Sequence, residues 1–183
     1  MKREKGQVLM ELLIAITVGV VLAAIGAQLA SVSLNAARSS RQQNEGMGLA
    51  QEGIEAMRAI ARTNSPSSQG WNKLYLPPDG TGASSTKGIG NPFHPEVIGG
   101  EWQLVSGSET VVLAGNTHTR SVIIENVSRA SSTRAILAAY DAAYDDPSTQ
   151  KVRVIVSRTG LPDIELSAYF TRFLNEVTVQ TNW

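Results

Sequence analysis

Residues 8–34, VLMELLIAITVGVVLAAIGAQLASVSL, decide how this chain is organised. Among these 27 residues, Glu11 is the only one with an ionisable side chain. A helix needs about 20 apolar residues to cross the hydrocarbon core of a bilayer, so this stretch is long enough to span a membrane. A carboxylate at full depth costs about 2.5–3.5 kcal/mol, and less near the interface, which indicates that Glu11 has a partner and a function.

A short charged leader precedes the apolar stretch. Residues 1–6, MKREKG, carry three basic side chains and one acidic side chain, a net charge of +2. The positive-inside rule places such a leader in the cytoplasm and the rest of the chain across the membrane. A secretory signal peptide has a similar outline, but its apolar run is about 7–15 residues long. The run here is longer, contains an acid and continues into a helical pattern without a clear small-residue cleavage site.

Residues 5–13, KGQVLMELL, resemble the N-terminal processing segment of type IV pilins and type II secretion pseudopilins. In that family a prepilin peptidase cuts after the glycine, methylates the new N-terminal amine and leaves a glutamate as the fifth mature residue. The resemblance therefore implies cleavage between Gly6 and Gln7, N-methylation of Gln7 and a role for Glu11 in subunit assembly. Gln7 departs from the family pattern, in which the first mature residue is usually phenylalanine or methionine.

The glutamate of this family pairs with the positively charged N-terminal amine of a neighbouring subunit. Two groups that are costly to bury alone become tolerable together, and the pair sets the register between subunits. The alternative for Glu11 is a carboxylate that rests at the membrane surface without such a partner.

Composition bounds the rest of the chain. A length of 183 residues suits one modest soluble domain after a membrane helix. Sixteen basic and sixteen acidic residues cancel and form no basic block, so nucleic-acid binding has no electrostatic support. The absence of cysteine excludes a disulfide framework. No Gly-x-Ser-x-Gly element or histidine–acid constellation is present, so we expect neither an enzyme nor a cofactor.

The helical pattern continues beyond the apolar stretch. Apolar residues recur at helical spacing at Met47, Ala50, Ile54, Met57 and Ala61. We expect a continuous helix over residues 8–62, whose amphipathic half, residues 35–62, packs on a globular domain. Glycines at positions 46, 48 and 53 weaken this half and make it a candidate for a bend.

From about residue 100 the sequence favours strands. The segments rich in valine, isoleucine and aromatic residues are 101–105, 110–114, 119–127, 151–157 and 164–170. Turn residues at 115–116 and 160–163 predict two antiparallel hairpins. Residues 64–68, NSPSS, are expected to end the helix, and the next thirty residues contain many prolines and glycines and are expected to form a loop that Trp71, Leu74, Tyr75 and Leu76 anchor to the core. Residues 130–144 predict a short helix or an ordered loop.

The expected fold class is α+β, with the long N-terminal helix packed on an antiparallel sheet of about four to five strands. The pilin resemblance implies the same arrangement. The chain then divides into a leader over residues 1–6, a membrane-spanning and polymerising half-helix over 7–34, an amphipathic half-helix over 35–62 and a β-rich domain over 63–183.

One acidic cluster is a weak candidate for a metal site. Asp141, Asp145 and Asp146 offer the oxygen ligands that calcium prefers, and some major pseudopilins carry a calcium site. The same residues are typical of an ordinary turn before a strand, which we favour. His94 and His118 have no ligand at a metal-binding spacing and are expected to be solvated.

Taken together, these patterns favour a structural subunit, a minor pilin or pseudopilin, of a type IV pilus or type II secretion-like filament. Its expected partners are the lipid bilayer, the prepilin peptidase, the inner-membrane assembly platform and other pilin-like subunits. We expect it in the inner (cytoplasmic) membrane, with its N-terminus in the cytoplasm, before it joins a filament. The alternative is a signal-anchored extracytoplasmic binding or enzymatic domain that is not part of a filament.

Overall fold

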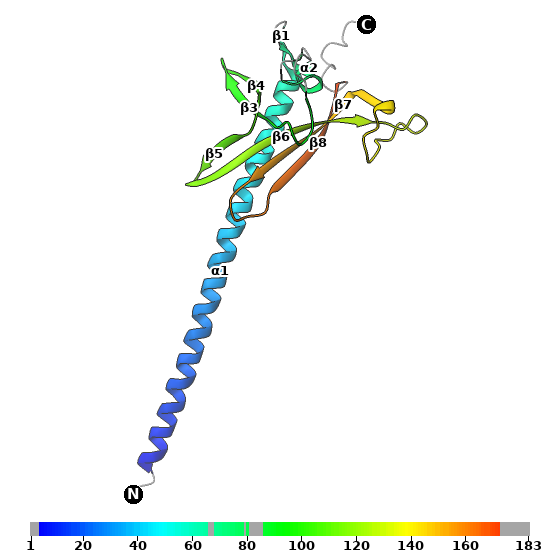
Figure 1. The fold of residues 1–183 in the computed structure, drawn as a ribbon. Coiled ribbons are helices and arrows are strands. Elements are labelled where there is room, and N and C mark those ends of the chain that lie inside the picture. The colour runs from blue at the N-terminus through cyan, green and yellow to red at the C-terminus, as the bar shows by residue number, and fades with distance from the viewer. Residues whose placement is uncertain (1–3, 66–67, 79, 81–85, 173–183) are drawn as a thin grey trace. The chain divides into compact units, whose positions relative to one another are not determined.

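A computed structural model describes residues 4–65, 68–78, 80 and 86–172 of the chain. The chain divides into two compact units, Met1–Asn44 and Glu45–Trp183. Helix α1 (Glu4–Arg62) contributes its N-terminal part to the first unit and its C-terminal part to the second. The expected continuous helix over residues 8–62 is therefore confirmed (Figure 1).

The first unit is helical because its sequence is rich in alanine and leucine, the strongest helix formers, and contains no proline. Every side chain from Gly6 to Arg41 is exposed. The apolar half of α1 is thus formed by local propensity and is not covered by other described parts of the chain.

The second unit contains the end of α1, the short helix α2 (Gly70–Tyr75) and the 3-10 turn η1 (Ala142–Tyr144). Its strands are β1 (Asn64–Ser65), β2 (Ser68–Gln69), β3 (Phe93–Ile98), β4 (Glu101–Ser106), β5 (Glu109–Leu113), β6 (Asn116–Ser128), β7 (Asp145–Ser157) and β8 (Ile164–Thr171). Six of them form one antiparallel sheet in the order β4-β3-β6-β7-β8, with β5 also paired to β6, and β1 and β2 pair with each other. The expected α+β class is confirmed (Figure 1).

The core lies where one face of α1 packs on the sheet. From α1 it contains Leu49, Ala50, Ile54, Met57, Ile60 and Ala61. From β6 and β7 it contains Val122, Ile124, Val152, Val154 and Val156. The helical residues recur at intervals of three and four, and the strand residues at intervals of two, as one buried face of each element requires. The expectation for Met47 was wrong, because this side chain is 40% exposed and Leu49 is buried in its place.

Both predicted hairpins are confirmed. β5 and β6 pair from Glu109↔Arg120 to Leu113↔Asn116, and β7 and β8 pair from Thr149↔Thr171 to Val156↔Ile164. The first turn is displaced by one residue from its expected position, because Ala114 and Gly115 have positive φ angles of 50° and 79°. Two such residues are typical of the type I′ turn that matches the twist of a hairpin.

The expectation of a loop over the thirty residues after Ser68 was wrong at both ends. α2 forms at Gly70–Tyr75 and buries Trp71 and Leu74, which confirms the anchoring role of these two side chains. β3 begins at Phe93 and contains Pro95. β3 pairs with β6 only at Phe93, so most of one side is unpaired, and such a strand can accommodate a proline.

Candidate functional site

The first candidate site is the apolar surface of α1 between Val8 and Leu34. Its large apolar side chains are between 48% and 68% exposed. In the part of the chain that the structure describes, α1 is the one helix that is long and apolar enough to cross a membrane. A continuous apolar surface of this extent marks an interaction with a membrane or with other proteins.

Gly6, Gln7 and Glu11 lie together on the first turns of α1. The Gln7 Nε2 atom donates a hydrogen bond to Glu11 Oε1 over 3.4 Å, a contact between neighbouring turns of one helix. A Cβ atom built on Gly6 would meet no other atom within 4 Å. Packing within the described chain therefore does not explain why position 6 is glycine.

A second group of polar residues lies where α1 meets the sheet, around one buried arginine. Arg120 on β6 is 3% exposed, and its Nε atom donates to Glu109 Oε1 on β5 over 2.6 Å. Its Nη1 atom donates to the Leu49 carbonyl over 3.1 Å and lies 3.6 Å from Glu52 Oε2. One guanidinium thus joins α1, β5 and β6, and its charge is balanced by carboxylates from two of these elements.

His118 lies beside this group and corrects an expectation. Its side chain is 2% exposed, and Nε2 is 4.0 Å from Glu45 Oε2. Asn116 Nδ2 donates to the same carboxylate oxygen over 3.1 Å. The expected solvated histidine was wrong, because the two-residue period of β6 places His118 on the buried face with Arg120 and Val122. His94 is half-buried, and its Nδ1 atom lies 3.2 Å from the Gly107 carbonyl oxygen.

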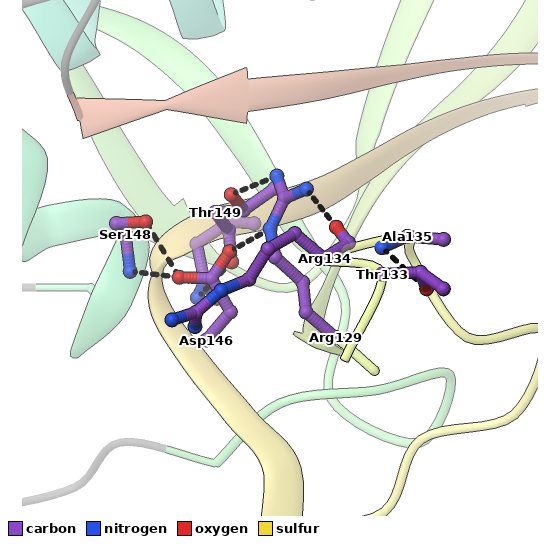
Figure 2. Close-up of polar contacts among 8 residues, drawn as sticks. Arg129, Thr133, Arg134, Ala135, Asp146, Ser148 and Thr149 are labelled. Atoms are coloured by element: carbon purple, nitrogen blue, oxygen red, sulfur yellow. Dashed lines mark hydrogen bonds and ion pairs between the residues drawn. The ribbon is translucent and has the colours of Figure 1, made fainter. Parts of the chain in front are cut away.

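The three aspartates of the predicted calcium candidate have separate local contacts. Asp141 caps η1 by accepting a hydrogen bond from the Ala143 amide over 2.9 Å. Asp145 is half-buried at the start of β7. Asp146 accepts hydrogen bonds from Arg129 and from the Ser148 amide (Figure 2). Among the residues that the structure describes, no three histidines, cysteines or acids gather where a metal could be held.

Arg129 fixes the segment between β6 and β7. Besides Asp146, its guanidinium donates to the Arg134 carbonyl over 2.9 Å and to Thr149 Oγ1 over 3.0 Å, as Figure 2 shows. Partial burial opposes ionisation of Asp146, but hydrogen bonds from Ser148, Thr149 and Arg129 outweigh it and lower its pKa to about 2. Residues 130–144 therefore form an ordered loop with one 3-10 turn, in agreement with the expectation for this segment.

A groove of about 490 Å³ lies beside the C-terminal end of β6. Lys87 lines it and is held at three points. Its Nζ atom donates to Asn126 Oδ1 over 2.7 Å and to Gln150 Oε1 over 2.5 Å, and it lies 4.7 Å from the centre of the Tyr75 ring. Burial lowers the pKa of Lys87 to about 8, although the nearby Asp145 carboxylate partly opposes this change.

The structure thus places Gly6, Gln7 and Glu11 within two turns of one helix, and it separates the contacts of Asp141, Asp145 and Asp146. The buried Arg120 and the groove around Lys87 were not anticipated. Alternate residues of β6 point to the same face of the sheet, so the spacing of Arg120 from Val122 and Ile124 could have indicated that Arg120 is buried. Comparison with protein-family models, with curated proteins and with solved structures finds no match.

Proposed function

We propose that this chain is a pilin-like structural subunit, of the minor pilin or pseudopilin kind. The observation that supports this most strongly is the uncovered apolar helix surface from Val8 to Leu34, which contains the single acid Glu11 and follows Gly6 and Gln7. The apolar half of α1 would hold the chain in the inner membrane until the subunit enters a type IV pilus or a type II secretion-like filament.

The mechanism is a transfer of one apolar helix between two apolar surroundings. In the bilayer, lipid chains cover the helix, and in the filament the equivalent helices of other subunits cover it. Since neither state exposes the helix to water, the hydrophobic cost of leaving the membrane is largely avoided. The basic leader keeps the N-terminus in the cytoplasm until a prepilin peptidase removes it.

Glu11 supplies the specificity that apolar contact lacks. After cleavage, the amine of Gln7 in one subunit would meet the Glu11 carboxylate of a neighbour in the apolar filament centre. A charge pair in such surroundings tolerates little displacement, so it fixes one register among many sliding positions. The exposed position of Glu11 on α1 is compatible with this contact.

The second unit has a surface suited to the aqueous side. On the sheet, Glu125 pairs with Lys151 at 3.7 Å and with Arg153 at 3.3 Å, and Arg153 also pairs with Glu165 at 3.2 Å. Rows of charged side chains of this kind are stable in contact with water and disfavour association with the sheets of other molecules. Such a surface suits water on either side of a membrane, and under the proposal the basic leader assigns the second unit to the extracytoplasmic side.

The test is processing by a prepilin peptidase. The chain is co-expressed with an active peptidase or with an inactivated one, and the mature protein is examined by mass spectrometry. We expect removal of residues 1–6 and methylation of Gln7 only with the active enzyme. Gly6→Leu should block cleavage, whereas Gly19→Leu should not, although a Cβ atom at either position meets nothing within 4 Å. An intact leader beside an active peptidase would contradict the proposal and favour a signal-anchored extracytoplasmic domain.

A further inference from the structure

Lys87 and Asn126 bring an amine and an amide carbonyl together within the second unit. The Lys87 Nζ atom lies 2.7 Å from Asn126 Oδ1, although the two residues are 39 positions apart in the chain. The backbone holds them there, since the Gly88 amide donates to the Ile124 carbonyl over 2.9 Å. The carbonyl carbon of Asn126 is bonded directly to Oδ1. An amine held this close to a carbonyl carbon reacts as if both groups were highly concentrated.

The surroundings of Lys87 increase the share of its neutral, nucleophilic form. Burial lowers its pKa to about 8, although the nearby Asp145 carboxylate partly opposes this change. At pH 7 about one-tenth of this amine is then neutral, compared with about 0.03% of an ordinary lysine. The Tyr75 ring, centred 4.7 Å from Nζ, and Gln150 Oε1, 2.5 Å from Nζ, fix the direction of the amine. A desolvated lysine of this kind is a nucleophile near neutral pH.

A carboxylate and a phenol lie beside the amine and the amide. Asp145 is near Lys87, and its Oδ1 atom is buried without a hydrogen-bond partner among the residues that the structure describes. A buried oxygen without a partner is rare, and a role in proton transfer explains it. The Tyr140 hydroxyl lies close to both the Asn126 amide and the Asp145 carboxylate. Because a phenol accepts from an amide N–H and donates to a carboxylate, Tyr140 connects the two groups.

We propose that Lys87 and Asn126 form an intramolecular isopeptide bond without another enzyme. The neutral Nζ atom attacks Asn126 Cγ, so that a new C–N bond forms while the bond from Cγ to Nδ2 breaks. Asp145 accepts the proton that Nζ loses, and Tyr140 passes a proton on from Asp145 to Nδ2, which leaves as ammonia. The reaction needs no oxidant, reductant or cofactor. Its product is a secondary amide that joins the segment before β3 to β6.

Asn126 is favoured over Gln150 as the acyl partner, although the amide oxygens of both accept from Nζ. Gln150 is fully buried, and its Nε2 atom already donates to the Thr149 carbonyl over 2.7 Å. Asn126 lines the groove beside β6, which gives ammonia a path to solvent. Only the Asn126 amide therefore combines a nearby nucleophile, a nearby phenol and an exit for the leaving group.

The isopeptide bond forms in a chain that has no cysteine and therefore no disulfide. It links positions 39 residues apart, and such a crosslink stabilises a fold by restricting the unfolded chain. Titration of the Lys87 amine is a property of the unreacted chain, because the amide product binds no proton near neutral pH. The inference does not rest on the proposed function, since both reacting side chains lie in the second unit.

The experiment follows the mass of the full-length chain in detergent micelles during incubation at pH 8. We expect the mass to fall by that of one ammonia molecule, and peptide mapping to find the peptides of Lys87 and Asn126 joined. Lys87→Arg keeps the charge but removes the nucleophile and should abolish the link, whereas Lys151→Arg in the same groove should not. Asp145→Asn should slow formation of the link by about 100-fold, whereas the exposed Asp163→Asn should not.

Joined peptides are the decisive observation. A succinimide at an asparagine loses the same mass but joins no peptides and persists in Lys87→Arg. A wild-type chain that keeps its full mass, or that loses ammonia with Lys87 and Asn126 in separate peptides, would overturn the proposal. A link from Lys87 to Gln150 would overturn the assignment to Asn126, and an unchanged rate in Asp145→Asn would exclude the role of this carboxylate. Circular dichroism of each variant shows whether a missing link reflects the chemistry or a loss of fold.

Discussion

Gly53 on α1 faces Val154 on β7 so closely that a Cβ atom at position 53 would lie 2.9 Å from Val154 Cγ1. Gly46 has a similar relationship with Ile164 on β8, where the corresponding distance to Cδ1 is 2.5 Å. The two glycines are seven residues, or about two turns, apart and so lie on one face of the helix. They lie within one uninterrupted helix and allow it to approach the sheet closely, which explains glycine at both positions.

Gly53→Ala is therefore expected to destabilise the second unit. Alanine improves helix propensity by about 1 kcal/mol, but overpacking against Val154 costs about 1–3 kcal/mol. We expect a lower free energy of unfolding, measured in urea through the fluorescence of Trp71 and Trp102. Gly48→Ala is the control, since a Cβ atom there meets nothing within 4 Å, and it should raise stability by about 1 kcal/mol. A Gly53→Ala variant as stable as Gly48→Ala would contradict the close approach.

Arg120→Met should be among the most destabilising substitutions in the second unit. It removes the cation from Glu109, which would then remain half-buried without its 2.6 Å partner, and we expect a loss of about 3 kcal/mol. The double variant Arg120→Met with Glu109→Gln should recover part of this loss in a double-mutant cycle. Arg58→Met is the control, because its exposed pair with Glu55 contributes less than about 1 kcal/mol. Equal losses for the two arginines would show that burial of Arg120 is not important.

Local patterns in the sequence predict most of the fold. The apolar period of α1 and the turn residues of the two hairpins are signals that depend on residues close together in the chain. Met47 was wrongly predicted to be buried. The helical period of apolar residues does not fix which side of α1 faces the sheet, and only the packing of α1 on the sheet shows that Leu49 is buried and Met47 is exposed. β3 was missed because Pro95 is unfavourable in a strand unless one side of that strand is unpaired, which only the topology reveals.

The candidate sites also differ in how far the sequence alone could predict them. The proposed processing residues Gly6, Gln7 and Glu11 could be named from the sequence because they lie within six consecutive positions of the chain. The contacts of Lys87 could not be predicted from the sequence, because its partners Asn126 and Gln150 are 39 and 63 residues away in the chain. A lysine in a glycine-rich and serine-rich loop is usually solvated, and nothing within the loop distinguishes this one.

Lys87 should make the stability of the second unit depend on alkaline pH. Its pKa is about 8 in the folded chain and 10.5 in the unfolded chain, so between these values the unfolded state binds more protons. The contribution of this group to stability must then rise with pH from about 8 to 10.5 and stay constant below 8. The difference in unfolding free energy between wild type and Lys87→Met should therefore increase over this window. A difference that is constant or falls from pH 7 to 10 would contradict the lowered pKa, and Lys73→Met is the control.

A truncated chain that begins at Arg38 is expected to fold without the apolar half of α1. All residues of the core cluster lie between Leu49 and Phe170, within the second unit, so none is lost by the truncation. The truncated chain also lacks the exposed apolar surface that would cause association in water. Circular dichroism should show helix and strand with one cooperative melting transition, and light scattering should show a monomer. An aggregated or non-cooperative product would show that the second unit needs residues before Arg38.

Glu11→Ala should leave membrane insertion intact and impair assembly, so that the two properties separate. Removing a carboxylate makes the helix easier to hold in lipid, and the lost contact with Gln7 is worth only about 0.2–0.5 kcal/mol. In a filament, however, the amine of a neighbouring Gln7 would remain in an apolar centre without its partner, at a cost of about 3–5 kcal/mol. Glu11→Gln should be nearly as poor, because it keeps size and hydrogen bonding but not charge. Gln28→Ala, a change of a polar residue in the same exposed helix surface, is the control and should assemble normally. Membrane abundance and recovery in sheared filaments or crosslinked subunit complexes are measured for all variants, and normal incorporation of both Glu11 variants would exclude the pairing role of this residue.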